Sequence, residues 1–130
     1  MSEQETLNRI TNTIIHAAID VHRALGPGLL ESAYETCMVF DLVEQYRLKV
    51  EQQKPLSLVY RGINLDYAYR LDLLINESVI VELKAVDKLL PIHEVQMLSY
   101  LKLSGCKLGL LINFNVKVLK DGIKRIVNNF

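Results

Sequence analysis

The first part of the chain carries a stripe of apolar residues at steps of three and four, the spacing of an amphipathic helix. This stripe predicts a helix over residues 3–25, and Ser2 and Glu5 precede it at the spacing of a capping box. A Gly-Pro-Gly segment at 26–28 should end the helix, because proline cannot extend a helix and glycine tolerates the left-handed conformation after its last turn.

A second helical stripe runs from Leu30 to about Tyr46. Phe40 and Val43 widen its apolar arc until the arc is nearly continuous. We therefore expect this second helix to be largely buried.

The pattern then changes to short runs of β-branched and aromatic residues, which favour strands. Turn residues separate the runs at 61–62 and 76–77. The predicted strands form a meander and cover residues 56–60, 65–75 and 79–86.

The last third of the chain predicts a helix between two strands. After Pro91 the helix should run to about Ser104 and end at Gly105, and residues 108–114 should form a buried strand. A strand, helix, strand order of this kind usually makes its two strands parallel. The tail at 116–127 predicts a hairpin around an Asp-Gly turn. Together the elements predict an α/β fold with helices packed on a sheet.

The composition bounds the class of protein. The chain has 130 residues, of which 50% are apolar and 23% charged, which fits one globular domain over residues 1–130. No apolar run is long enough to cross a membrane, and the acidic, polar N-terminus does not resemble a secretory signal. We therefore expect no membrane association and a cytoplasmic location, with Cys37 and Cys106 as reduced thiols.

Charge is distributed unevenly along the chain. Residues 1–87 contain 8 Lys and Arg and 13 Asp and Glu, a net charge of −5, whereas residues 88–130 contain 7 and 2, a net charge of +5. The balance excludes a protein that binds nucleic acid through bulk positive charge. The basic part could contact a polyanion, or its lysines could simply be solvated.

Two carboxylates stand within strand patterns whose other positions are apolar. Alternation places Glu82 and Lys84 on one face of the 79–86 strand. If this strand pairs with the preceding one through the turn at 76–77, residues whose numbers sum to about 154 lie opposite, which sets Asp72 against Glu82. Two like charges at that spacing raise a pKa or recruit a hard divalent cation such as Mg²⁺. The alternative is an exposed pair of charges, Glu82 and Lys84, on an uncovered sheet face.

These residues resemble a known nuclease signature. Asp72 followed by Glu82-Leu83-Lys84 is similar to the D…(D/E)xK motif of the PD-(D/E)XK nuclease superfamily. The segment from Gly28 through Glu31 to Tyr34 matches the G-x-x-E-x-x-Y motif of a small bacterial and archaeal family within it.

The resemblance implies a restriction-endonuclease-like core, in which a mixed central sheet carries the N-terminal helices and a crossover helix. It also implies that Asp72 and Glu82 hold Mg²⁺ or Mn²⁺, that Lys84 is the catalytic lysine, and that Glu31 is a further acid. The Leu83 carbonyl is a further candidate ligand. Glu31 could instead be a partner of the helix dipole.

Three polar residues share a face of the third predicted helix: His93, Gln96 and Tyr100. Gln96 and Tyr100 resemble the Q-x-x-x-Y feature of RecB-like branches of the superfamily, which implies a role in placing substrate and lysine. The alternatives are a buried hydrogen-bonding pair for these two and a structural role for His93. Tyr34 is a candidate for substrate positioning or a core residue.

The resulting hypothesis is metal-assisted hydrolysis of phosphodiester bonds in nucleic acid, with DNA and RNA both open. Its alternative is a catalytically inactive module on the same fold that binds nucleic acid or a protein. A third possibility is a structural partner in a toxin or phage-defence assembly. A homodimer or a protein partner would supply additional binding surface.

Overall fold

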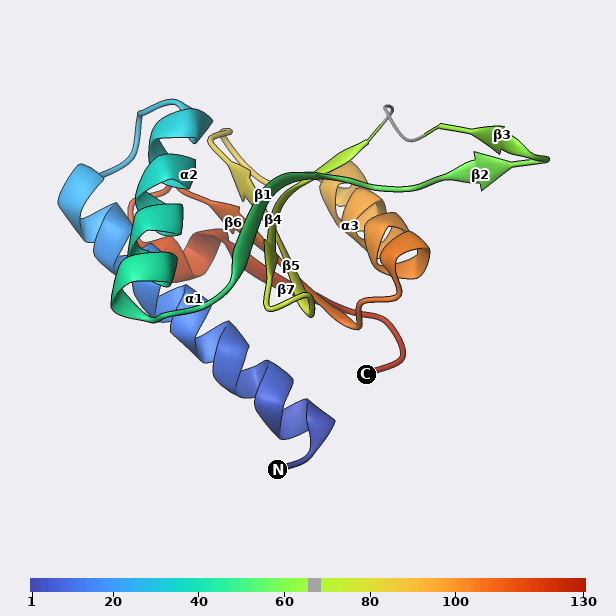
Figure 1. Cartoon of the computed structure of the whole chain (residues 1–130). Coiled ribbons are helices and arrows are strands. Elements are labelled where there is room, and N and C mark those ends of the chain that lie inside the picture. The colour runs from blue at the N-terminus through green and yellow to red at the C-terminus, as the bar shows by residue number, and fades with distance from the viewer. Residues whose placement is uncertain (66–68) are drawn as a thin grey trace.

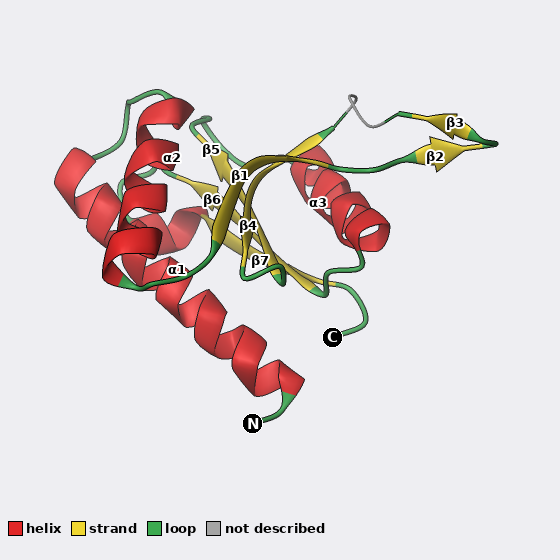
Figure 2. Ribbon diagram, in the orientation of Figure 1, coloured by secondary structure: helices red, strands yellow, loops and turns green. Residues whose placement is uncertain are grey.

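The structure is a computed structural model, and it describes residues 1–65 and 69–130. Its centre is a five-stranded sheet with the strand order β1-β4-β5-β6-β7 (Figures 1 and 2). β5 and β6 are parallel, as predicted, and the other neighbours are antiparallel. The strands are β1 (Val50–Pro55), β4 (Arg70–Ile75), β5 (Val79–Lys84), β6 (Leu108–Asn113) and β7 (Ile123–Val127).

Helices cover both faces of this sheet. One face packs against α1 (Glu3–Leu25) and α2 (Glu31–Phe40), which continues as a π-helical turn over Asp41–Gln45. The other face packs against α3 (Pro91–Ser104), which connects β5 to β6 (Figure 1). This mixed sheet between helical layers confirms the restriction-endonuclease-like fold expected from the sequence.

Local signals fixed several elements as predicted. The Ser2 hydroxyl oxygen accepts a hydrogen bond from the Glu5 amide at 3.1 Å and donates one to the Glu5 carboxylate at 3.0 Å, so Ser2 caps the start of α1. α3 ends at Gly105, whose φ of +79° is left-handed. Asn76 and Glu77 both have positive φ, which makes the tight turn between β4 and β5.

The strands of the predicted meander differ in extent from the observed ones. β1 was not predicted, because its sequence is mostly polar. Of the predicted strand over 56–60, only Val59–Tyr60 form a strand. The predicted strand over 65–75 partly falls on residues 66–68, which lie outside the part that the structure describes, and β4 begins at Arg70. The segment between β1 and β4 instead contains a separate hairpin of β2 (Val59–Tyr60) and β3 (Ile63–Asn64), which projects from the body (Figure 2).

The C-terminal hairpin prediction was also wrong. Residues Leu119–Gly122 form a 3-10 turn, and β7 pairs with β6 instead of with the segment before the turn. Gly122 is buried, and a Cβ atom built on it would lie 2.2 Å from the Asn113 carbonyl oxygen. Glycine is therefore needed there for a close backbone approach, which the sequence pattern of a turn does not distinguish.

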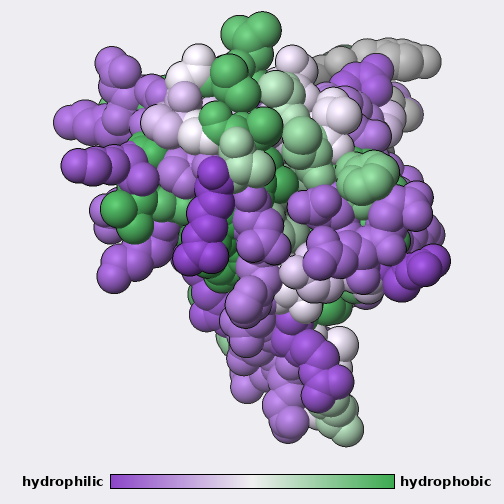
Figure 3. All heavy atoms as spheres, turned by 90° about the vertical axis from the view of Figure 1, so that its left-hand side faces the viewer, coloured by the Kyte–Doolittle hydropathy of each residue, from purple (hydrophilic) through white to green (hydrophobic). Residues whose placement is uncertain are grey.

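The second helix is less buried than predicted. Its inner residues Tyr34, Met38 and Leu42 are fully buried, but Phe40 is 66% exposed and Val43 is 37% exposed. Figure 3 views the molecule from the side of α1 and α2 and shows apolar surface on this side among hydrophilic side chains. The apolar arc is thus wider than the surface that the sheet covers.

The remaining expectations from composition concern membranes and cysteines. Across residues 1–65 and 69–130, none of the helices combines the length and apolar character that a membrane span requires. Cys37 and Cys106 are free and partly buried.

Candidate active site

Asp72 on β4 and Glu82 on β5 lie together at the end of their strand pair. The regular ladder reaches Leu73 and Val81, whose numbers sum to 154 as the predicted register requires. Beyond it, the Asp72 amide donates to Glu82 Oε2 at 2.7 Å, and the Leu83 amide donates to Asp72 Oδ2 at 2.8 Å. Each carboxylate therefore binds the backbone of the other strand, which holds both side chains in fixed positions.

Glu82 lies in an environment that disfavours its negative charge. Glu82 is only 5% exposed, and its neighbours on β5 are buried apolar residues. Burial, followed by the charge of Asp72, raises the pKa of Glu82 to about 8, although the Asp72 amide and the charge of Lys84 act in the opposite direction. At neutral pH the isolated pair therefore favours a bound proton or a cation.

The donor set of this pair suits a hard divalent cation. Glu82 Oε2 and Asp72 Oδ2 each accept a hydrogen bond from a backbone amide, and Asp72 Oδ1 has a long contact of 3.5 Å to Gln53. Carboxylate oxygens are the ligands that Mg²⁺ prefers, and Mg²⁺ commonly binds one or two carboxylates while keeping water and phosphate ligands. The residues present therefore fit a magnesium or manganese ion.

A third acidic ligand is not gathered at the pair. Within residues 1–65 and 69–130, the structure contains no group of three or more His, Cys, Asp or Glu residues that could hold a metal ion. Glu31 is exposed at the first residue of α2, where the helix dipole favours a negative charge. The structure therefore brings Asp72 and Glu82 together and does not group Glu31 with them.

Gln53, which the sequence analysis missed, lies beside Asp72 and connects it to Glu35. Gln53 on β1 contacts Asp72 through its side-chain amide, and the same amide donates to Glu35 of α2 at 3.1 Å. Gln52 donates to the same Glu35 carboxylate at 3.1 Å. Glu35 lies one helical turn after Glu31, so the helical spacing could have suggested it, but β1 itself gave no strand signal.

Lys84 ends β5 and is half-buried on the same strand face as Glu82. Its positive charge lowers the pKa of Glu82 through space, although burial and Asp72 outweigh this effect. Its backbone carbonyl accepts a hydrogen bond from the Phe114 amide at 2.9 Å, which fixes the strand end. The ammonium group therefore acts on the charge of the carboxylate pair.

Tyr100 on α3 lies over the same region of the sheet. It is 7% exposed and belongs to the apolar cluster that contains Leu71 and Ile80, which are close to the carboxylates in sequence. Burial, followed by the charges of Glu82 and Asp72, raises the pKa of Tyr100. Its phenol is therefore within electrostatic range of both carboxylates.

The other two residues of the α3 stripe are placed differently. Gln96 is exposed and, with Tyr100, lines a groove beside α3. His93 Nδ1 accepts a hydrogen bond from the Leu90 amide at 3.0 Å at the start of the helix. His93 therefore has the structural role that the sequence analysis left open.

Tyr34 is a core residue. It is fully buried, and its ring stacks on Phe114 with a centroid distance of 4.4 Å. Its hydroxyl donates to the Gly26 carbonyl at 2.6 Å and accepts from the Leu29 amide at 3.1 Å. This burial excludes direct contact of its side chain with a bound substrate, and the hydroxyl instead fixes the connection between α1 and α2.

We expect Tyr34→Phe to lower the free energy of unfolding by about 1–2 kcal/mol, because it leaves two backbone groups without their partner. Tyr34→Ala should cost about 3–5 kcal/mol, since it also removes the buried ring. Urea denaturation of both variants measures the difference. Loss of function in Tyr34→Phe at unchanged stability would contradict the packing role.

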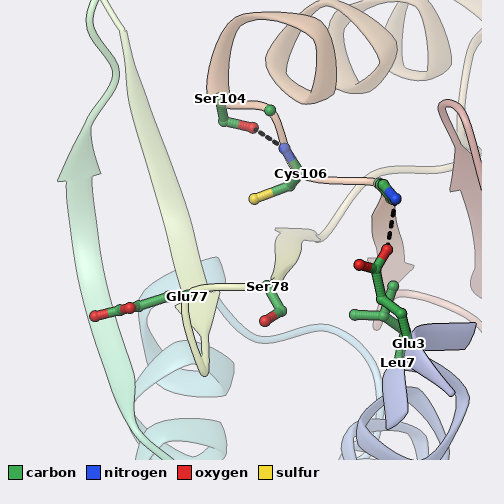
Figure 4. Close-up of a pocket in the computed structure, with 8 residues that line it drawn as sticks. Glu3, Leu7, Glu77, Ser78, Ser104 and Cys106 are labelled. Carbon is green, nitrogen blue, oxygen red and sulfur yellow. Dashed lines mark hydrogen bonds and ion pairs between the residues drawn. The ribbon is translucent and has the colours of Figure 1, made fainter. Parts of the chain in front are cut away.

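A separate hollow lies at the opposite end of β5, at the turn that precedes Val79 (Figure 4). Two pairs of its polar groups bind one another: Lys107 pairs with Glu3 at 2.6 Å, and the Cys106 amide donates to the Ser104 hydroxyl at 3.1 Å. The hollow therefore lies away from the carboxylate pair and is not part of the candidate site.

Comparison with known proteins agrees with this fold. The sequence profile of the PD-(D/E)XK nuclease superfamily matches residues 8–126. Because that match covers nearly the whole chain, the chain belongs to the PD-(D/E)XK nuclease superfamily.

Among solved structures, the chain is similar to one described as "Crystal structure of SSO0001", with a TM-score of 0.52 and 20% sequence identity. The match covers 76% of this chain and 50% of that one, so the chain spans about half the length of that protein. At this identity the likeness concerns the fold. No curated protein matches the chain.

Proposed function

We propose that the chain is a metal-dependent nuclease that hydrolyses phosphodiester bonds of nucleic acid at the Asp72 and Glu82 pair. The observation that carries this proposal is the pair itself: two carboxylates locked together by each other's backbone amides, one of them buried with a raised pKa. A buried carboxylate beside a second carboxylate is costly unless a proton or a cation compensates its charge, and a hard divalent cation can do so. Membership of the nuclease superfamily supports the same proposal.

Each residue has a defined task under this proposal. Asp72 and Glu82, with the Leu83 carbonyl, hold Mg²⁺ or Mn²⁺. When bound, this ion lowers the pKa of a water molecule and neutralises phosphate charge. Lys84 stabilises the negative charge that develops on the phosphate. Tyr100 and Gln96 position the substrate, and Glu31 remains a candidate for a more distant acid at the start of α2.

A catalytically inactive module that binds nucleic acid or a protein is the second candidate function. The observation that favours it is that the described part of the chain gathers two acids and no third at the site. A homodimer or a protein partner would add binding surface in either case. The motif Gly28, Glu31 and Tyr34 supports the finer assignment to the G-x-x-E-x-x-Y family, and a cytoplasmic location agrees with a nucleic-acid substrate.

A cleavage assay separates the two functions. Labelled single- and double-stranded DNA and RNA are incubated with the protein in Mg²⁺, in Mn²⁺ and in EDTA. We expect products with either metal and none in EDTA, and an exposed control, Glu44→Gln, should behave as the native protein. Salt-dependent binding without cleavage under any metal would favour the inactive module.

A further inference from the structure

A groove with a volume of about 410 Å³ runs beside α3, between this helix and the segments that flank the β2–β3 hairpin. Its lining is largely apolar and contains two aromatic rings and two uncharged polar side chains. The described residues that line it are Leu58, Tyr69, Ile92, Val95, Gln96, Ser99, Tyr100 and Leu103.

This groove adjoins the carboxylate pair through Tyr100. Tyr100 lines the groove and also packs in the cluster with Leu71 and Ile80 on the sheet face below α3. Leu71 precedes Asp72 directly, and Ile80 shares its strand face with Glu82. A ligand that places a phosphate at the carboxylates can therefore place its next chemical group in the groove.

The chemistry of the groove suits a nucleobase. None of the described lining residues is charged, so these residues offer no ion pair to a phosphate. The Tyr69 ring is 42% exposed and tilted by 60° from the Tyr100 ring at a centroid distance of 6.3 Å, so the two rings do not stack on each other. Gln96 and Ser99 can donate to and accept from the edge of a base.

We propose that this groove binds an unstacked base of single-stranded nucleic acid, with Tyr69 as its stacking partner, while the adjoining phosphate lies at Asp72 and Glu82. The inference rests on the proposed nuclease function and adds the substrate class. A base within a duplex is already stacked on both faces, so it cannot enter the groove without leaving the helix.

The hairpin beside the groove supports the same class of ligand. Tyr60 is 59% exposed, and the Arg61 guanidinium lies 5.3 Å from the centre of its ring. Aromatic rings combined with arginine are the groups on which single strands bind, because every base has a face that can stack. The β2–β3 hairpin projects past α3 and away from the central sheet (Figure 1).

The test compares two single strands that differ only in their bases: an oligothymidylate of about twelve residues and an abasic sugar-phosphate strand of equal length. Binding is measured with Ca²⁺ in place of Mg²⁺, and the strands are checked to be intact afterwards. The native protein should bind the oligothymidylate about 5- to 150-fold more tightly than the abasic strand. Tyr69→Ala should bind the two strands equally tightly. Tyr69→Phe, which retains the ring, should keep the native ratio of the two affinities.

A second variant guards against misfolding of Tyr69→Ala. Val95→Glu adds a negative charge at a groove residue that is 58% exposed and should also abolish the ratio. Val127→Glu adds the same charge on β7, at a residue that is 41% exposed, and should leave the ratio unchanged. Melting temperatures of all variants are compared with that of the native protein.

The outcomes separate this inference from the nuclease proposal. Cleavage in Mg²⁺ with an unchanged ratio in Tyr69→Ala would overturn the groove assignment and leave the nuclease. A ratio that depends on Tyr69 without cleavage would retain the groove and overturn the nuclease. If a duplex binds as tightly as the oligothymidylate, or if Tyr69→Ala converts a dimer of this chain into monomers, the groove has a different occupant.

Discussion

Replacing Glu82 by Gln should reduce the rate of phosphodiester cleavage by at least about a thousandfold, and Lys84→Ala should reduce it by about a hundred- to a thousandfold. Glu82→Gln retains a carbonyl oxygen that can accept the hydrogen bond from the Asp72 amide, but it removes the charge that binds a cation. Lys84→Ala removes the positive charge next to the pair. Both changes should act on kcat, because they remove interactions with charge that develops in the transition state.

The matched control for Lys84→Ala is Lys102→Ala. Lys102 is exposed near the end of α3, so its loss should leave kcat unchanged. Rates are measured under single-turnover conditions at saturating protein, which separates chemistry from binding. If Glu82→Gln cleaves at the native rate, the pair is not the catalytic centre.

The free energy of unfolding of the metal-free protein should fall as pH rises from about 4.5 to about 8. Glu82 binds its proton more tightly in the folded state, so between these values the folded state holds a proton that the unfolded state has released. The contribution of this proton to the free energy of unfolding is fully present below the ordinary pKa of a glutamate. It is lost as the pH rises through the pKa that Glu82 has in the folded state. Its slope is at most about 1.4 kcal/mol per pH unit.

Glu82→Gln should flatten this dependence and make the metal-free protein more stable than the native one at pH 8. Saturating Mg²⁺ should restore stability to the native protein alone, because a ligand that binds only the folded state stabilises it. Urea denaturation in EDTA across this pH range measures both effects. Parallel curves for the native and variant proteins would show that Glu82 does not carry the pH dependence.

The carboxylate pair could be predicted because its determinants are local. Two residues with positive φ at 76 and 77 set the register of β4 and β5, and the alternation of side chains then placed Asp72 opposite Glu82. A one-residue slip would have moved the apolar partners to the wrong face, so the register is strongly specified.

The surroundings of the pair could not be predicted, because they depend on segments distant in sequence. β1 is the edge strand of the sheet, and most of its residues are exposed and polar. The sequence therefore gave no signal for a strand that places Gln53 beside Asp72. The connection to Glu35 of α2 depends on that strand. Glu31 is the acidic residue of the G-x-x-E-x-x-Y motif. The structure instead links Glu35, the next acidic residue of α2, to Asp72 through Gln53.

The roles of Gly122 and Tyr34 could not be predicted either, because they too depend on neighbours that are distant in sequence. Gly122 followed an aspartate, as in a hairpin turn, yet its function is close contact with the backbone at Asn113. Tyr34 belonged to a conspicuous motif, yet its ring lies in the core against Phe114. Motif residues that organise packing and motif residues that perform chemistry look alike until their neighbours are known.

The most direct test of the account is the anomalous scattering of Mn²⁺ in crystals of the protein soaked at saturating metal concentration. We predict one strong peak at about 2.0–2.2 Å from a carboxylate oxygen of Asp72 and from one of Glu82, and no such peak in Glu82→Gln. A manganese peak elsewhere, with this pair empty, would contradict the assignment of Asp72 and Glu82 as the metal site.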